Sequence, residues 1–311
     1  MHKILTLDSI MSMIRPVTFQ QNLFVLIGTM SGILGLWKIQ GKNCEMVEII
    51  ELESPVSIVC DIYYYDDYAV TYLSTYNQEV YMVKITDSGL DIRMLSLKTV
   101  INRTLITDKS IIMSGAELYV AKHTNGIIDM SSIIGCYAPD DTTFKVSFTK
   151  GKHIYQTTHD GLVYKVSKRE GQLYLQHIPS LIADAATGFV TKSGLYTCVA
   201  SVHGYNGQYK KGSLCRVYKE TAEDQWSIAY EQQTSPTSKE FPYPDVNPIQ
   251  DYGGSISLSP NKFIIVTENG IRTYTHPYQN DLRTSPTIYK NVMFYTTYHD
   301  GKTSLYIAET T

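Results

Sequence analysis

The stretch Gln156-Thr157-Thr158-His159-Asp160-Gly161-Leu162-Val163-Tyr164-Lys165-Val166 predicts a β-hairpin. Asp160-Gly161 supplies the turn, because glycine adopts positive φ without a Cβ clash. Apolar residues alternate on either side of this turn, which is the period of a half-buried strand. They are Ile154, Leu162, Tyr164 and Val166. The rest of the chain reads as looser copies of this hairpin.

Seven such units follow one another, each with about four short strands joined by tight turns. The first four span residues 23–52, 56–97, 100–134 and 144–181, the fifth spans 187–233, and the last two start at 254 and near 286. The expected third strands give a ruler with a mean spacing of about 45 residues, which is the length of a propeller blade. The residues of this ruler are Trp37, Tyr81, Tyr119, Tyr164, Val217, Thr273 and Tyr306.

The two ends of the chain complement each other. The seventh unit lacks a fourth strand, and residues 3–7 form a spare strand before the first unit begins. A terminal strand that completes the last blade closes a ring and hides sheet edges that would otherwise aggregate. The pattern therefore predicts seven blades, with six or eight as the alternatives.

At this level the chain resembles the β-propeller superfamily over nearly its whole length. The resemblance is architectural, because no Trp-Asp pair of WD40 blades surrounds Trp37 or Trp226, and Gly253-Gly254 alone offers a kelch-like pair. The segment Thr158-His159-Asp160-Gly161 approaches the Asp-box of sialidases, but no Trp follows it. The resemblance implies an all-β, seven-bladed propeller of four-stranded antiparallel blades, in a single domain over 1–311.

Composition excludes some classes of partner. The chain has 311 residues, 18% of them charged, and a formal net charge of −3. Phosphate binding needs clustered Lys and Arg, and the only short basic runs are Lys168-Arg169 and Lys210-Lys211, so we expect no nucleic-acid partner. No run approaches the roughly 20 apolar residues of a membrane span, so we expect no membrane insertion.

The cysteines and the N-terminal residues bear on location. No Cys-x-x-Cys pair occurs among Cys44, Cys60, Cys136, Cys198 and Cys215. An odd, scattered set of cysteines fits free thiols in a reducing compartment and gives no support to a metal or redox cofactor. Asp8 interrupts the short apolar run at the N-terminus, so no signal peptide is expected. We expect a cytoplasmic protein or one incorporated in a virion, without cofactors.

Two long connections stand out, residues 204–212 and residues 234–252, where most turns have two to four residues. In propellers, loops between second and third strands and loops between blades open on the same face. Prolines stiffen the second connection, so its aromatic residues are presented at low entropic cost. The connections are interpreted either as a partner-docking face or as tolerated surface insertions. The candidate partner-binding residues on this face are Tyr205, Tyr209, Lys210, Lys211, Phe241, Tyr243, Asp245, His159, Asp160, His299 and Asp300.

His159-Asp160 and His299-Asp300 occupy equivalent turns. Such pairs can bind a divalent metal or act as general acid and base. They are also ordinary hairpin-turn residues, because Asp and Gly are favoured in turns. The two pairs lie three units apart along the chain, so we assign neither a metal site nor catalytic residues.

Two function classes remain. The first is a non-enzymatic interaction or structural propeller in a larger assembly, docking protein partners through its loop-rich face. Its sharpest version is a viral or phage particle component, because the Tyr-, Thr- and Ile-rich composition resembles that of viral structural proteins. The alternative is a carbohydrate-active or glycan-binding propeller. An enzyme of that kind predicts three acidic residues on the innermost strands, which we place at 57–62, 104–107, 145–148 and 255–258, and only Asp61 is found there.

Overall fold

The computed structural model describes residues 2–9, 11–19, 22–150, 152–183, 185–190, 196–202, 213–234, 246–249, 253–259, 262–267, 270–275, 281–282, 287–289 and 292–309. Their regular structure is almost entirely β. The two helices among them are short 3₁₀ segments, η1 (Met130–Ser132) and η2 (Pro139–Asp141). None of the described helices has the length and hydropathy of a membrane span. The strands fall into two compact units, Met1–Tyr137 with Val292–Thr311, and Ala138–Asn291.

The first unit contains three sheets that follow one another along the chain. The first is β2 (Met11–Phe19), β3 (Asn22–Thr29), β4 (Ile33–Gln40) and β5 (Asn43–Glu51). The second is β6 (Val56–Val59), β8 (Ala69–Thr75), β9 (Glu79–Thr86) and β10 (Gly89–Lys98), with β7 (Tyr63–Tyr64) also paired to β8. The third is β11 (Ile101–Ile106), β12 (Ile111–Gly115), β13 (Glu117–Ala121) and β16 (Ile134–Tyr137), with the small hairpin of β14 (His123–Thr124) and β15 (Ile127–Ile128) between its last two strands.

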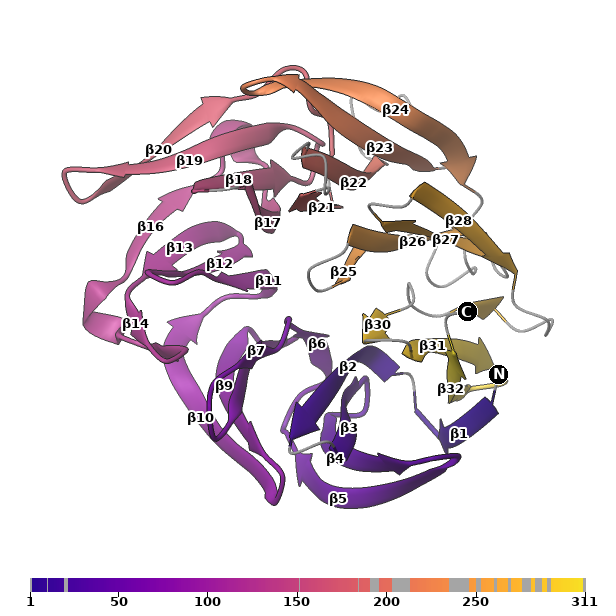
Figure 1. Ribbon diagram of the computed structural model, residues 1–311. Coiled ribbons are helices and arrows are strands. Elements are labelled where there is room, and N and C mark those ends of the chain that lie inside the picture. Colours follow the sequence, from indigo (N-terminus) through magenta and orange to yellow (C-terminus); the bar gives the residue numbers. More distant parts are fainter. Residues whose placement is uncertain are drawn as a thin grey trace. The chain divides into compact units, whose positions relative to one another are not determined.

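The second unit contains three further four-stranded sheets, whose strands Figure 1 labels in chain order. The first is β17 (Phe144–Lys150), β18 (His153–Thr158), β19 (Val163–Arg169) and β20 (Gln172–His177). The second is β21 (Ala185–Val190), β22 (Tyr196–Val202), β23 (Ser213–Ala222) and β24 (Gln225–Thr234). The third is β25 (Val246–Ile249), β26 (Gly253–Ser259), β27 (Lys262–Thr267) and β28 (Gly270–Thr275), and β29 (Asp281–Leu282) and β30 (Thr287–Tyr289) follow it.

Each of these sheets is an antiparallel meander, which is the blade of a β-propeller. First strands contact first strands of the next blade, as β2 does β6 and β17 does β21, so we call them inner strands. The fourth strand, at the opposite sheet edge, is called the outer strand. The described residues thus confirm the predicted all-β architecture of four-stranded antiparallel blades, with six such blades, three in each unit, where the sequence predicts seven.

Strands predicted as part of the seventh blade pair with the N-terminal strand within the first unit. Strand β31 (Val292–His299) pairs with β32 (Lys302–Glu309), and β32 pairs with β1 (His2–Leu7). In this last ladder His2 lies opposite Ile307 and Leu7 lies opposite Thr303. The N-terminal strand therefore does pair with the C-terminal hairpin, whereas closure of a ring by this sheet stays a prediction.

One predicted unit boundary is wrong. The sequence predicts that the sixth unit starts at residue 254, with 255–258 as its innermost strand, but the blade begins earlier, at β25. Residues 255–258 lie in its second strand, and Thr273 lies in its fourth strand instead of its third. Pro248 falls inside β25, and because proline is rare within strands, the sequence pattern there predicts a loop. The insertion predicted at 234–252 consequently contains an inner strand.

The core lies between blades, because the second strands are buried on both faces. All seven residues of β8 and all five of β12 are buried. This explains their nearly continuous apolar or small composition, since a strand covered on both sides has no face for alternating polar residues. One core cluster joins β3 to β8 and another joins β8 to β12 within the first unit. A third joins the β18 and β23 blades of the second unit.

The hairpin quoted at the outset forms as predicted. Strand β18 ends at Thr158 and β19 begins at Val163. Gly161 between them has a φ of 89°, the left-handed region that glycine tolerates. The Gly161 N–H donates to the Thr158 carbonyl at 3.0 Å, and the Thr158 N–H donates to the Leu162 carbonyl at 3.0 Å.

Candidate functional site

The predicted site residue Asp160 is built into its own turn. Its side chain is half-buried, and its Oδ1 accepts from the Thr158 hydroxyl at 2.5 Å and from the Thr142 hydroxyl at 3.4 Å. The exposed His159 donates its backbone N–H to the Thr143 carbonyl at 2.8 Å. These contacts are those of an Asp-stabilised turn, which was the alternative to a metal or acid–base site.

In the second pair, His299 is the last residue of β31 and Asp300 lies in the turn to β32, in the other unit. Asp300 is exposed and has a φ of 49°, a conformation that Asp tolerates better than most residues. The side chain of His299 lies outside the described residues. Across the part of the chain that is described, no three His, Cys, Asp or Glu side chains gather as metal ligands.

The remaining predicted docking residues fall outside the described residues, so their role stays a prediction. They are Tyr205, Tyr209, Lys210, Lys211, Phe241, Tyr243 and Asp245. The first insertion falls in the sequence between β22 and β23, the second and third strands of their blade, and the face on which it opens stays a prediction.

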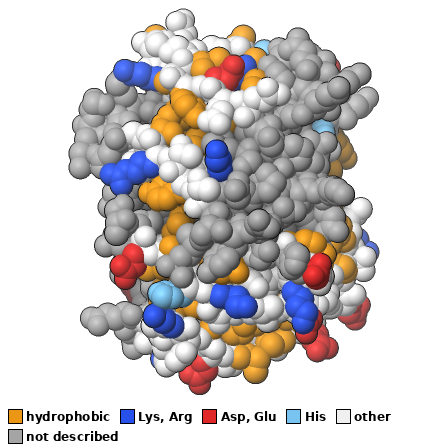
Figure 2. All heavy atoms as spheres, turned by 90° about the vertical axis from the view of Figure 1, so that its right-hand side faces the viewer, with side chains coloured by type: hydrophobic (Ala, Val, Ile, Leu, Met, Phe, Trp, Pro, Cys, Tyr) orange, Lys and Arg blue, Asp and Glu red, His pale blue; other side chains and the backbone are white. Residues whose placement is uncertain are grey.

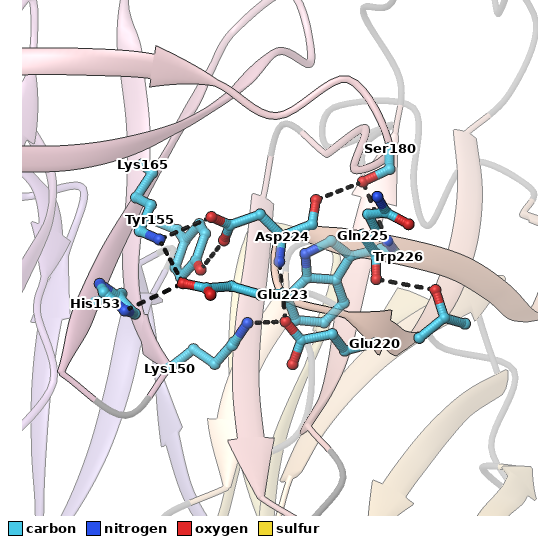
Figure 3. A network of polar contacts seen from close by, with 11 residues as sticks. Lys150, His153, Tyr155, Lys165, Ser180, Glu220, Glu223, Asp224, Gln225 and Trp226 are labelled. Carbon is cyan, nitrogen blue, oxygen red and sulfur yellow. Dashed lines mark hydrogen bonds and ion pairs between the residues drawn. The ribbon is translucent and has the colours of Figure 1, made fainter.

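Sequence reasoning missed a polar network of ion pairs and hydrogen bonds, which Figure 3 shows. It joins two blades of the second unit, between the β17–β18 hairpin and the tight turn from β23 to β24. At its centre lies Asp224, which takes a left-handed φ of 57° in that turn. Asp is one of the few residues that adopt this conformation at low cost. We call the set the Asp224 network, and its members are Lys150, His153, Tyr155, Lys165, Glu220, Glu223 and Asp224.

Asp224 receives donors from the neighbouring blade. Lys165 Nζ lies 2.7 Å from its Oδ2, and the Tyr155 hydroxyl donates to its Oδ1 at 2.5 Å. Its backbone N–H donates to Glu220 Oε1 at 3.2 Å, and its carbonyl accepts from the Ser180 hydroxyl at 3.1 Å. Both the side chain and the main chain of Asp224 therefore hold the β23–β24 turn in place.

A second ion pair lies beside the first. Lys150 at the end of β17 pairs with Glu220 of β23, and their side chains are 8% and 13% exposed. The Lys150 ammonium also lies over the Trp226 ring, 5.3 Å from its centroid. Trp226 packs edge-on against Tyr155 with centroids 6.5 Å apart. Aromatic rings from both blades thus shield the Lys150–Glu220 pair from water, which strengthens that pair.

The environment shifts the acid–base properties of these groups. Burial pushes the pKa of Asp224 upward, but the hydrogen bonds from Lys165 and Tyr155 outweigh it and the pKa is lowered. The hydrogen bond to Asp224 raises the pKa of Lys165. Burial, followed by the hydrogen bond to Asp224, raises the pKa of Tyr155. Burial lowers the pKa of Lys150.

These shifts and contacts describe a tie between blades. Each lysine faces a carboxylate, and the Tyr155 proton is held by Asp224. A general acid or base needs a pKa near the working pH, whereas the shifts of Asp224, Lys165 and Tyr155 move their pKa values further from neutrality. The network is therefore suited to fixing two blades together.

A second charged cluster joins two arginines on inner strands of the first unit to Asp61, which follows inner strand β6 and is the one innermost acid that the sequence predicts. Arg103 of β11 donates from Nε to Asp61 Oδ2 at 3.1 Å and from Nη2 to Oδ1 at 3.3 Å. Arg15 of β2 reaches Asp61 Oδ1 with Nη2 at 3.2 Å. The side chains of Arg15, Asp61 and Arg103, here called the Asp61 cluster, come from three consecutive blades and are 5%, 24% and 6% exposed.

The Asp61 cluster lies beside buried groups. The carbonyl of the buried Cys60 accepts from Arg15 Nε at 3.1 Å, and burial raises the pKa of the Cys60 thiol to about 11. Burial likewise raises the pKa of Tyr63. Cys60 has a free thiol, as do Cys44, Cys136 and the buried Cys215, whose pKa burial raises to about 12. For these four residues the predicted free cysteines are confirmed.

The glycosidase alternative required three acids on inner strands. The first strands of the six described blades contain no Asp or Glu (β2, β6, β11, β17, β21 and β25). Asp61 follows β6 and is engaged by two guanidinium groups. The geometry therefore assigns this acid to the joint between three blades.

The Asp61 cluster had a signal in the sequence that could have revealed it. Arg15 and Arg103 are each the single charged residue of an otherwise uncharged inner strand. A buried arginine requires a carboxylate partner, so two such strands flanking Asp61 indicate an ion triad. The Asp224 network had no comparable signal, because its pairs depend on how one blade is placed against the next.

Comparisons with known proteins agree with the fold. No family model matches the sequence, and neither does any curated protein. The crystal structure of BamB from Moraxella catarrhalis is similar with a TM-score of 0.51 and 9% identity, over 97% of this chain and 96% of that chain. The β-propeller domain of Cps50 (Swd1) from Myceliophteria thermophila is similar with a TM-score of 0.60 and 12% identity, over 98% of both chains. At such identities the likeness shows the fold alone, and the fold of this chain is a β-propeller.

Proposed function

We propose that this chain is a non-enzymatic interaction subunit, a propeller that docks protein partners within a larger assembly. The observation that carries the proposal is the position of exposed apolar side chains. Nine large hydrophobic residues are exposed among those described, and seven of them lie on outer strands. They are Met46 and Ile49 of β5, Met94 of β10, Tyr137 of β16, Tyr174 of β20, Ile228 of β24 and Ile271 of β28.

Outer strands are the places where such residues are most costly to leave uncovered. An edge strand presents unpaired backbone groups, and apolar side chains beside them invite another chain to pair. Met94 is 61% exposed and Met46 is 58% exposed. Since every described blade carries at least one such residue on its outer strand, the docking surface is distributed along the blade edges.

The ion pairing of the charged groups supports a non-enzymatic role. The half-buried carboxylates of Asp61, Glu220 and Asp224 face arginines and lysines. In both places the charges stabilise contacts between blades. The blades are thereby held in a stable arrangement, and their outer strands are left for contacts with partners.

The proposal has a sharper form, in which the assembly is a viral or phage particle. Its support is the composition, with 25 tyrosines and only 18% charged residues in 311. The loop-rich face, with Tyr205, Tyr209, Phe241 and Tyr243, is a further docking surface within the same proposal.

The test is the native mass of the untagged protein taken from its source, measured by light scattering after gel filtration. We expect a mass far above 35.2 kDa. Deleting residues 235–245, a range that spares inner strand β25, is expected to lower it if the loop-rich face docks partners. Met94→Lys is expected to lower it if the outer strands dock them.

Tyr76→Lys is the matched control, because Tyr76 is 56% exposed but lies in the turn between β8 and β9. It is expected to leave the native mass unchanged. A native protein that elutes as a clean 35.2 kDa monomer would contradict the proposed role.

A further inference from the structure

Strand β24 is as long as β10, the other ten-residue outer strand, but it carries a single charged residue. It runs for ten residues at the edge of the sheet β21-β22-β23-β24, and among the described residues it pairs with β23 alone. At about 3.3 Å per residue it offers an edge of roughly 33 Å. Figure 1 shows it as the outermost strand of its blade.

Natural edges are protected by charged residues, by proline or by being short. Strand β24 contains no lysine and no proline, and its one charged residue is Glu231. Arg216 of β23 already engages that carboxylate, with Nε 2.7 Å from Oε2. By contrast, β10 has the same length but carries Asp91, Arg93 and Lys98.

The strand is firmly held at its start and exposed beyond it. Trp226 is 7% exposed and packs against Tyr155, and its backbone N–H donates to the Ser180 hydroxyl at 3.1 Å. Residues 227–229 and 231–233 are exposed, so side chains on both faces of the strand reach solvent. A bulge at residue 229 leaves 230–234 as a regular segment, opposite 213–217 of β23.

The composition of that segment indicates which partner fits. Gln232 and Gln233 each carry both donors and an acceptor, so such side chains are complementary to themselves. An edge that recognised a charged peptide would carry the opposite charge, as β5 could with Glu45, Glu48 and Glu51. The near absence of charge on β24 means that two copies can meet without repulsion.

From these features we infer that β24 pairs antiparallel with β24 of a second copy of this chain, around a two-fold axis near Gln232. This is strand addition at a sheet edge, in an isologous interface. The inference rests on the proposed docking role of the outer strands and names one partner for one of them. A single strand pair buries less than the roughly 1,000 Å² of a stable interface, so the dimer is expected to be weak and concentration-dependent.

The test uses the purified full chain and measures its mass by light scattering over a concentration series. The expected result is a rise from 35.2 kDa towards twice that mass as concentration increases. Gln232→Lys and Gln232→Glu each place like charges at the two-fold axis and are expected to weaken the dimer at least tenfold. Mixing the two variants is expected to restore the association, which neither a misfolded variant nor a merely structural role of Gln232 would do.

Ser96→Lys is the control, because it adds the same charge at an exposed position of the equally long β10. It should leave the dimer intact. A purified chain that stays monomeric at every concentration overturns the inference, and so does a Gln232→Lys variant that dimerises like the wild type. A monomeric pure chain with a large native mass would overturn self-pairing while leaving the proposed function standing.

Discussion

At the scale of single residues, Gly35 allows the Trp37 ring to pack directly against the backbone of β4. A Cβ added at Gly35 would lie 2.2 Å from the ring of Trp37, two residues along β4, and Trp37 is 4% exposed. The indole therefore lies on the glycine itself. In the sequence this is a Gly inside a strand, which is a mark of close approach.

Gly35→Ala is expected to destabilise the protein by about 1–3 kcal/mol, because the buried indole has to leave its position. The free energy of unfolding from urea denaturation measures this cost. Trp37→Phe removes the clashing atoms, so the same Gly35→Ala change should cost less in that background. Equal costs in both backgrounds would show that the clash is not the cause.

Asp224 gives a residue-scale prediction for pH. Its folded-state pKa is lowered below the ordinary value of 3.8, so the stability it contributes is present above that value and is lost as pH falls through the folded pKa. Asp224→Asn is expected to cost about 1.5–3 kcal/mol at pH 7, the range for a hydrogen bond to a charged group. The gap between variant and wild type should shrink below about pH 4.

The measurement is the denaturation midpoint of both proteins from pH 7 downward. Glu223→Gln serves as the control, because the neighbouring carboxylate is 76% exposed and its loss should change little. A gap that stays constant through the acid range would argue that the charge of Asp224 is not what ties the blades.

At the scale of elements, β1 is the strand whose removal should matter most relative to its length. It covers the edge of β32, with the Thr6 hydroxyl 3.1 Å from that of Ser304. Deleting residues 2–7 uncovers that edge and is expected to cost about 1 kcal/mol for each ladder hydrogen bond lost. Thermal unfolding and light scattering should show a lower Tm and aggregation.

Lys302→Ala separates the ladder from the ion pair beside it. Lys302 and Asp8 are 2.8 Å apart, but both side chains are largely exposed. Such pairs contribute little, so this variant should keep the Tm of the wild type. A deletion that behaves like Lys302→Ala would mean that β1 is dispensable to the sheet.

Most strands could be predicted because tight turns punctuate a period of about 45 residues in this chain. In the blade from β17 to β20, Asp160-Gly161 predicts the turn between β18 and β19, since the glycine requirement is local. Strand β25 was missed because Pro248 normally marks a loop, and no local rule shows that it sits on an inner strand.

At the scale of the whole molecule, what sequence reasoning could not reach is the fit of one blade against the next. Asp61 was found because it stands beside an inner strand, but its two arginines come from other blades. The sequence does not reveal the role of Asp224, because its partners Lys165 and Tyr155 lie 59 and 69 residues away along the chain. The repeat period predicts where strands lie, whereas the residues that pair between neighbouring blades differ from one pair of blades to the next.

The buried thiols of Cys60 and Cys215 have a consequence for kinetics. Each is fully inaccessible, one in each compact unit, and their pKa values of about 11 and about 12 keep them protonated at neutral pH. The thiolate is the reactive form, so neither can be alkylated until its own surroundings open. The alkylation rates of Cys60 and Cys215 therefore report the rates of local opening in the two compact units separately.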